Sequence, residues 1–329
     1  MSFQNAKQIR LHDFKPSLGH FRAEALSGLR KWQKELPCKY FYDERGSYLF
    51  DCICHLHEYY IPRTETAIMK AYIEEIVEAL GPNVILIEYG SGNSAKTHIL
   101  LDHLWELEAY MPIDISREQL LRAANELASV YPGLEVLPVC ADYTSAFQPP
   151  DLKRPARRKV VYFPGSTIGN FEPGPAKWFL ECIAGVCGPG GGLLIGVDLR
   201  KDPRVLHRAY NDRQGVTAAF NLNLLERINR ELGGDFQVDL FEHYAFYSPR
   251  EGRVEMHLVS LRDHTAQLDD VTIPFVKGES IWTESSYKFS IDQFQQMAAT
   301  AGFEVEHVWM DEQQWFSVQY LVNRGDTTS

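Results

Sequence analysis

A glycine-rich turn followed by acidic residues is the part of the sequence whose composition and spacing point most directly to chemistry. An apolar run ends in Glu88-Tyr89-Gly90-Ser91-Gly92, and Lys96 follows it. Glycines let the backbone approach a ligand closely where a strand turns into a helix. Asp114 and Asp142 end the next two expected strands, where a carboxylate can accept hydrogen bonds from ribose hydroxyls or reach an adenine edge. The pattern therefore predicts a site for a nucleoside-containing ligand.

Two ligand classes fit this turn, namely dinucleotides and S-adenosylmethionine. The full G-x-G-x-x-G fingerprint is missing because Lys96 and its neighbours stand where the third glycine would be, which weakens the nicotinamide interpretation. An E-x-G-x-G sequence at the end of the first strand is the usual S-adenosylmethionine turn. A tight turn followed by solvated aspartates is the structural alternative.

The elements that must position this turn alternate between strand and helix. The sequence predicts strands over 84–90, 109–114, 134–142, 159–166 and 192–199, with helices over 95–105, 116–128 and 175–188 between them. This alternation implies a parallel sheet with helices on both faces. A helix over 290–303 and two last strands would complete a seven-stranded sheet. We also expect Ser116 to cap its helix, with Gln119 in the capping-box position.

The remaining residues exceed what a nucleotide-binding unit needs. We assign 66–199 and 287–329 to a cofactor-binding domain, and 1–65 and 200–286 to a second, discontinuous substrate domain. The second part contains an expected helix over 216–232 and expected strands over 253–261 and 280–289.

The composition of the 329-residue chain excludes several classes of protein. A net charge of −11 argues against nucleic-acid partners and anionic membranes. No apolar run reaches the roughly 18 residues of a membrane span, and residues 1–14 lack the core of a signal peptide. The six cysteines, several inside apolar runs, suit a reducing cytosol. We therefore expect a cytoplasmic monomer acting on a small molecule.

A series of ordered motifs gives the sequence a specific resemblance. Over residues 36–322 it resembles the S-adenosylmethionine-dependent histidine Nα-methyltransferases of ergothioneine biosynthesis, which make hercynine, the betaine of histidine. That family combines a Rossmann-like class I methyltransferase sheet with a discontinuous α+β substrate domain, and the same α/β fold is expected here. The resemblance is carried by segments 39–43, 46–50, 58–65, 88–97, 165–170, 198–199, 208–210, 215–221, 228–232, 253–256 and 283–289.

The resemblance implies roles for individual residues. S-adenosylmethionine would be bound by Gly90, Ser91, Gly92, Lys96, Asp114 and Asp142. The amino-acid end of histidine would be held by Tyr59, Asn170 and Tyr210, and its imidazole by Glu284 and Ser286. Tyr42 and Phe50 would wall the amine and its growing methyl groups, and Met256 would line the same pocket.

The chemistry of methyl transfer suits these residue types. The attacking α-amine must be neutral, so Tyr42 is assigned orientation first and proton relay second, because a tyrosine with a pKa near ~10 is a poor base at neutral pH. Aromatic rings tolerate a quaternary ammonium through cation–π attraction. Asn170 can donate to a carboxylate and accept from an amine. Glu284 and Ser286, two apart on a strand, face the same side and can pair with both ring nitrogens.

Other readings remain open at this point. The same chemistry could act on another amino acid, such as tryptophan or prenylated tryptophan, although Glu284 and Met256 favour a compact polar ring. A non-catalytic amino-acid sensor could keep the same fold. The Cys52-Ile53-Cys54 sequence lacks the spacing and the second ligand pair of a zinc site, so no metal is expected. Hydrolase motifs such as G-x-S-x-G are absent from the sequence.

Overall fold

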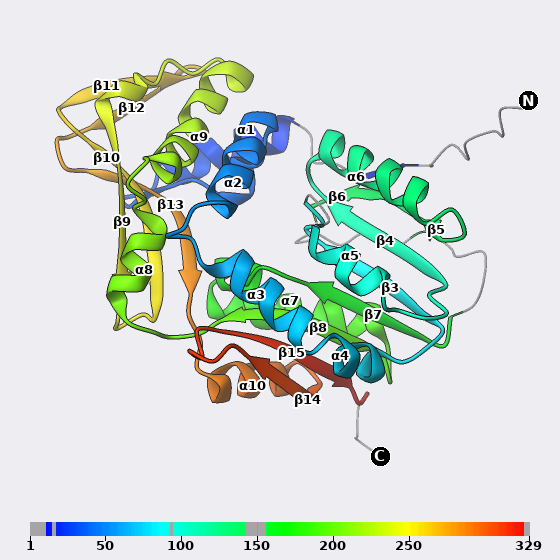
Figure 1. Ribbon diagram of the computed structural model, residues 1–329. Helices are drawn as coiled ribbons and strands as arrows, with labels where there is room; N and C mark the ends of the chain where they lie inside the picture. Colours follow the sequence, from blue (N-terminus) through cyan, green and yellow to red (C-terminus); the bar gives the residue numbers. More distant parts are fainter. Residues whose placement is uncertain (1–10, 15–17, 93–94, 143–149, 151–155, 326–329) are drawn as a thin grey trace, which may run out of the picture.

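Two lobes make up the chain, one built on a large sheet and one on a smaller sheet (Figure 1). The structure is a computed structural model that describes residues 11–14, 18–92, 95–142, 150 and 156–325. Of residues 1–14, which lack the apolar core of a signal peptide, the structure describes only 11–14. Within the described part of the chain, no helix is both long and apolar enough to cross a membrane.

The large sheet contains the seven strands that the sequence predicts. Their order is β6-β4-β3-β7-β8-β15-β14, with β15 antiparallel to both of its neighbours. This doubly wound sheet confirms the predicted α/β fold. The strands are β3 (Val84–Tyr89), β4 (Ala109–Asp114), β6 (Val139–Ala141), β7 (Arg158–Phe163), β8 (Gly192–Asp198), β14 (Phe303–Met310) and β15 (Phe316–Asn323). Two short strands add to them: β1 (His12–Phe14) pairs with β6, and β5 (Glu135–Val136) pairs with β4.

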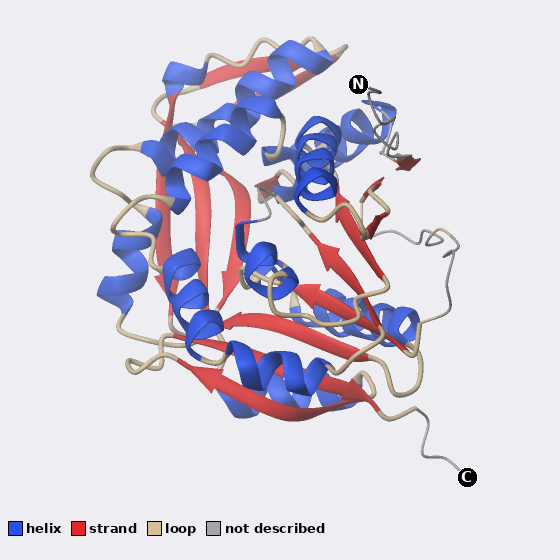
Figure 2. Ribbon diagram, turned by 45° about the vertical axis from the view of Figure 1, so that its right-hand side comes forward, coloured by secondary structure: helices blue, strands red, loops and turns tan. Residues whose placement is uncertain are grey.

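Helices cover both faces of this sheet (Figure 2). Successive residues of a strand point to opposite faces, so Leu86 packs with α3 (Ile61–Ala71) and α4 (Ile73–Leu80), whereas Ile87 packs with α7 (Pro173–Cys187). The remaining helices of this lobe are α5 (Ala95–Leu101), α6 (Arg117–Val130) and α10 (Ile291–Thr300).

Two local predictions in this lobe are wrong. The strand expected over 134–142 is broken into β5 and β6, because Pro138 has no N–H to donate to a ladder. Ser116 makes no side-chain capping bond; its backbone N–H instead donates to Asp114 Oδ1 at 2.8 Å. The carboxylate that ends β4 therefore shapes the turn into α6.

The smaller sheet has the order β2-β13-β10-β9. Its strands β9 and β10 pack against α9, and α2 packs against α9 in turn. The register places Met256 of β10 opposite Glu284 of β13. The elements of this lobe are α1 (Leu18–Leu29), β2 (Lys34–Glu35), η1 (Cys38–Phe41), α2 (Glu44–Cys54), α8 (Pro203–Tyr210), α9 (Val216–Leu232), η3 (Val238–Leu240), β9 (Phe241–Ser248), β10 (Arg253–Ser260), β11 (His264–Leu268), β12 (Val271–Phe275) and β13 (Ser280–Tyr287).

The chain passes between the lobes four times, and the last two crossings are neighbours. It leaves the large sheet after Asp198 and returns at Phe289, and the two crossing segments pair: Phe289 N donates to Asp198 O at 3.0 Å, and Arg200 N donates to Phe289 O at 2.9 Å. Most of the second lobe is thus inserted between β8 and α10, whereas α1, β2, η1 and α2 come from the segment before α3. Strand β1 lies in the large sheet, although the sequence analysis grouped all of residues 1–65 with the substrate domain.

Candidate active site

The turn after β3 has the backbone geometry that its glycines allow. Gly90 and Gly92 have φ values of +71° and +48°, a region that L side chains rarely adopt. Gly90 N donates to Ile113 O at 2.8 Å, and Gly92 N donates to Asp114 Oδ2 at 3.1 Å. Ser91 Oγ is buried and has no hydrogen-bond partner among the described residues. A turn with an unpaired buried hydroxyl fits a polar ligand such as the amino-acid end of S-adenosylmethionine.

Both predicted acidic residues are held in place by neighbouring groups, and Asp114 contacts the turn directly. Asp114 accepts backbone hydrogen bonds at both carboxylate oxygens, and burial raises the pKa of its carboxyl. Asp142 is only 7% exposed and pairs with Lys39, whose Nζ lies 3.0 Å from Asp142 Oδ2. Lys39 also pairs with Glu24. Both carboxylates are therefore fixed before any ligand binds.

Lys96 connects the glycine turn to the loop after β7. Its Nζ pairs with Glu65, which is fully buried on α3. The same carboxylate accepts the Gly165 N–H at 3.0 Å and 3.1 Å from its two oxygens. Gly165 lines a cavity, described next, so one buried carboxylate joins the expected cofactor turn to the expected substrate site.

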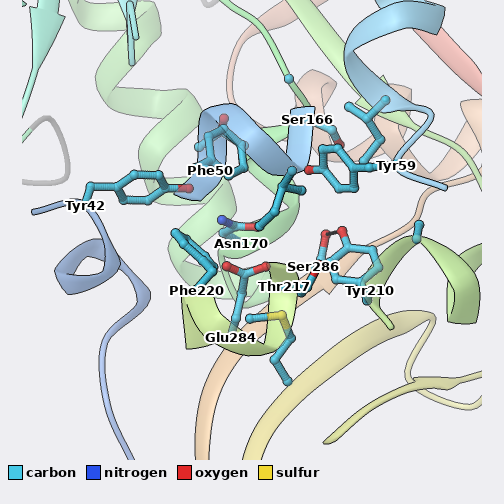
Figure 3. Close-up of a pocket in the computed structure, with 16 residues that line it drawn as sticks. Tyr42, Phe50, Tyr59, Ser166, Asn170, Tyr210, Thr217, Phe220, Glu284 and Ser286 are labelled. Atoms are coloured by element: carbon cyan, nitrogen blue, oxygen red, sulfur yellow. Dashed lines mark hydrogen bonds between the residues drawn. The ribbon is translucent and has the colours of Figure 1, made fainter. Parts of the chain in front are cut away.

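One cavity collects every substrate-binding residue that the sequence predicts (Figure 3). Its volume is about 550 Å³, including space open to solvent. The predicted residues that line it are Tyr42, Phe50, Tyr59, Asn170, Tyr210, Met256, Glu284 and Ser286. They come from both lobes, because Asn170 belongs to the loop after β7 and the others to the smaller lobe or the segments around α2. The structure therefore brings these residues together; their individual roles stay predictions.

Aromatic rings form a continuous wall of this cavity. Phe50 contacts Tyr42 edge-on at 5.6 Å between ring centroids and Tyr59 at 6.3 Å, and Tyr59 meets Tyr210 at 6.1 Å. Phe220 of α9 lies 5.9 Å from both Tyr42 and Phe50. Such a wall can stabilise a cationic ammonium by cation–π attraction.

Glu284 and Ser286 supply polar groups to the same cavity from β13. Burial raises the pKa of Glu284 to about 7, and the nearby Lys288 ammonium opposes that rise. Ser286 Oγ accepts a hydrogen bond from Tyr210 Oη at 2.8 Å. A carboxylate and a hydroxyl side by side can pair with the two nitrogens of an imidazole.

Asn170 owes its place to an unusual loop, η2 (Thr167–Asn170). Ser166, just before it, adopts a left-handed φ of +61°, and its Oγ accepts the Asp198 N–H at 2.8 Å. A Cβ on Gly169 would lie 2.7 Å from Tyr287 O, so only glycine allows this loop to rest on β13. Figure 3 shows Asn170 between the aromatic rings and Glu284. Glu172, two residues further on, is the N-cap residue of α7.

Sequence reasoning assigned no role to several other residues of the cavity. Phe220 and Thr217 belong to motifs that carry the family resemblance, and that resemblance was the available signal for them. The unassigned lining residues are Ile53, Ile61, Gly165, Ser166, Thr167, Ala209, Thr217 and Phe220. Among the residues that the structure describes, no group of three or more His, Cys, Asp or Glu side chains could hold a metal ion.

Comparison with known proteins identifies the family. Residues 21–323 match the family described as histidine-specific methyltransferase, SAM-dependent. The chain is 42% identical to the histidine N-alpha-methyltransferases of Mycobacterium tuberculosis, over 89% of this chain and 92% of that protein, and of Mycolicibacterium smegmatis, over 88% and 91%. It is 31% identical to ergothioneine biosynthesis protein 1 of Neurospora crassa, over 84% of this chain and 32% of that longer protein. The chain therefore belongs to the histidine-specific, S-adenosylmethionine-dependent methyltransferases.

Proposed function

We propose that this enzyme transfers three methyl groups in succession to the α-amine of L-histidine, giving hercynine for ergothioneine biosynthesis. The names of its relatives support this substrate and product. The observation that carries the proposal is that Glu284, Ser286 and Asn170 line one cavity. Gly165, at the edge of this cavity, donates to Glu65, which also pairs with Lys96 of the proposed cofactor site. This link supports a binding site for the histidine ring beside the proposed cofactor turn.

The residues that hold the two ligands divide between the lobes. S-adenosylmethionine, when bound, supplies an electrophilic methyl group on a sulfonium. The residues proposed to hold it are Gly90, Ser91, Gly92, Lys96, Asp114 and Asp142. Asn170 takes the carboxylate and amine of histidine, with the hydroxyls of Tyr59 and Tyr210 beside it. Burial raises the pKa of Tyr59 well above its ordinary value, so its hydroxyl stays protonated and can donate a hydrogen bond.

The aromatic side chains of the cavity surround the α-amine of the substrate. Before each transfer the ammonium form of the substrate must lose a proton, which Tyr42 relays. Tyr42 also orients the resulting neutral amine. Phe50 and Tyr59 surround the nitrogen, and their rings stabilise it as it becomes a quaternary ammonium. Tyr42 and Asn170 are thus the proposed catalytic residues, and Met256 restricts the size of the ring that enters.

The proposal extends to the whole chain. The cofactor domain comprises residues 66–199 and 287–329 together with β1 and the start of α3, and the substrate domain comprises the rest of 1–65 together with 200–286. A cytosolic monomer without nucleic-acid or membrane partners is proposed, because the net charge of −11 disfavours anionic partners and all six cysteines are free thiols.

Incubation with S-adenosylmethionine and a panel of amino acids, read by mass spectrometry, tests this function. L-Histidine should gain three methyl groups, and tryptophan should react at least about a hundredfold more slowly, because the buried polar groups of the site would be left unpaired. Methylation of tryptophan alone would select the rival substrate. Methylation of none of the panel would indicate an amino-acid sensor.

A further inference from the structure

A buried lysine lies directly behind the imidazole-reading end of the cavity. Lys288 follows β13, and its side chain is inaccessible to solvent. Its Nζ lies 2.8 Å from Ser286 Oγ, 3.0 Å from Tyr210 Oη and 2.7 Å from Asp198 Oδ2. An ammonium has three N–H donors, so all three have acceptors within the protein. Lys288 therefore has no donor left for a substrate.

This lysine is held in its charged form. Burial opposes the charge, but the carboxylate of Asp198 and the hydroxyl of Tyr210 outweigh it, so the pKa of Lys288 lies above its ordinary value. Asp198 is itself fixed by the Tyr60 hydroxyl, which lies 2.8 Å from both carboxylate oxygens, and by an ion pair with Lys201. A permanent cation thus stands behind Ser286 and Tyr210.

The cation determines what Ser286 offers to the cavity. Ser286 Oγ accepts from Lys288 and from Tyr210 Oη, which occupies both of its lone pairs. The remaining capacity of Ser286 is its own hydroxyl proton, so it acts as a donor. Glu284, two residues earlier on the strand, plays the opposite part, because an ionised carboxylate only accepts. Burial raises the pKa of Glu284 to about 7, and the nearby Lys288 ammonium opposes that rise and so favours the ionised, accepting form.

We propose that Lys288 is a positioning residue that fixes Ser286 as a hydrogen-bond donor and Glu284 as an acceptor, so that the cavity selects the neutral imidazole of histidine, with one N–H and one bare nitrogen. Lys288 acts through these neighbours and does not touch the substrate. The inference rests on the proposed function, since it requires that histidine occupies the cavity.

Nitrogen NMR of ring-¹⁵N-labelled L-histidine bound to the unaltered enzyme, with S-adenosylhomocysteine present, tests the inference directly. One protonated and one unprotonated ring nitrogen are expected in the bound state. Two protonated nitrogens would mean that the site takes the imidazolium, which overturns the inference but leaves the proposed function intact. The absence of any bound histidine would contradict the proposed function and the inference with it.

A double-mutant cycle tests the role of Lys288 itself. Lys288→Met should lower kcat/KM for histidine by at least about tenfold, but for 3-(2-thienyl)alanine, whose ring has no nitrogen, by no more than about twofold. In a Ser286→Ala background the same change should cost little, because its partner is already gone. Equal losses for both amino acids, or additive effects of the two substitutions, would overturn the assignment. Lys34→Met, at another buried lysine of this lobe, is the control and should leave the histidine-to-thienylalanine ratio unchanged.

Discussion

At the residue scale, the proposed recognition of the histidine ring depends most on one carboxylate. Glu284 lines the cavity, and burial raises its pKa to about 7. Glu284→Ala should weaken histidine binding by at least about tenfold and leave S-adenosylhomocysteine binding unchanged, because a charged hydrogen bond to the ring is lost. Calorimetry measures both affinities. Glu255→Ala, on the other face of the neighbouring strand, is the control and should change neither. Equal losses of both ligands in Glu284→Ala would contradict the assignment.

The aromatic wall should matter more as methylation proceeds. Phe50→Leu removes a ring from the wall but keeps an apolar side chain. Cation–π attraction of about 0.5–2 kcal/mol is lost only once the nitrogen carries a permanent charge, so dimethylhistidine should accumulate at the expense of trimethylhistidine. Mass spectrometry of the product mixture over time measures this. Tyr48→Leu, an exposed ring on the same helix, should give the normal product ratio. Uniform slowing of all three transfers would argue against the cation–π role.

The sequence predicted the lining of the cavity well, because each predicted residue lies in a short motif that the family resemblance covers. It left Phe220 and Lys288 without roles, although both stand in such motifs. Phe220 is one of many apolar residues on α9, and only packing shows that it reaches Tyr42 and Phe50. Lys288 contacts Tyr210 and Asp198, which are 78 and 90 residues away in sequence, so no local pattern could reveal its partners.

At the element scale, η2 rests closely on β13, and we expect this contact to set the distance from Asn170 to Glu284 and Ser286. Gly169→Ala would place a Cβ 2.7 Å from Tyr287 O and 3.2 Å from Tyr287 N, so the loop must shift. We expect KM for histidine to rise at least about tenfold and stability to fall by about 1–3 kcal/mol. Steady-state kinetics and thermal melting measure these effects.

Gly174 offers a matched control for that substitution. A Cβ at Gly174, in the first turn of α7, would meet no atom within 4 Å. Gly174→Ala should therefore leave KM and melting temperature essentially unchanged. If both variants bound histidine like the parent enzyme, the close approach of η2 to β13 would not be what positions Asn170.

Elements were predicted most accurately where hydrophobic periodicity is strong. The helix expected over 216–232 has those same bounds in α9, and the seven strands of the large sheet are all present. Prediction failed where one side chain overrides the pattern, as at Pro138, or where a carboxylate from outside the helix competes with the expected cap, as at Asp114. No helix was predicted within 18–80, where the structure has α1, α2, α3 and α4, because these short helices depend on packing against the two sheets.

At the scale of the whole molecule, a buried acid in the glycine turn should make stability depend on pH. Glu88 is buried and accepts hydrogen bonds from Thr97 at 2.6 Å and Tyr110 at 2.5 Å; burial dominates and raises its pKa from 4.5 to about 7. Between these values the folded state binds more protons than the unfolded state. Stability from this group therefore falls as pH rises from about 4.5 to about 7, by up to about 3 kcal/mol.

Glu88→Gln isolates that contribution. The glutamine can accept the same two hydrogen bonds but cannot ionise, so the variant should gain stability relative to the parent enzyme as pH rises. Urea unfolding at about pH 5 and about pH 8 measures the difference in the free energy of unfolding. A constant offset between the two proteins at both pH values would contradict this assignment of the pH dependence.

The insertion of one lobe into the other could be predicted because the strand–helix alternation stops after β8 and resumes before α10. The sequence could not show that the two crossing segments pair with each other, or that β1 joins the large sheet, because both are long-range contacts without a local signal. The cavity forms only when both lobes contribute to it, which is why a function that depends on Asn170 and Glu284 together belongs to the whole chain.

The central claim is that histidine occupies the cavity between the lobes with its ring on β13 and its amine toward the aromatic wall. A crystal structure with L-histidine and S-adenosylhomocysteine tests it most directly. The account predicts ring nitrogens within hydrogen-bond distance of Glu284 and Ser286, the carboxylate at Asn170, and the α-amine between Tyr42 and Phe50. Histidine bound outside this cavity, or with its ring toward Tyr42 and its amine toward Glu284, would contradict it.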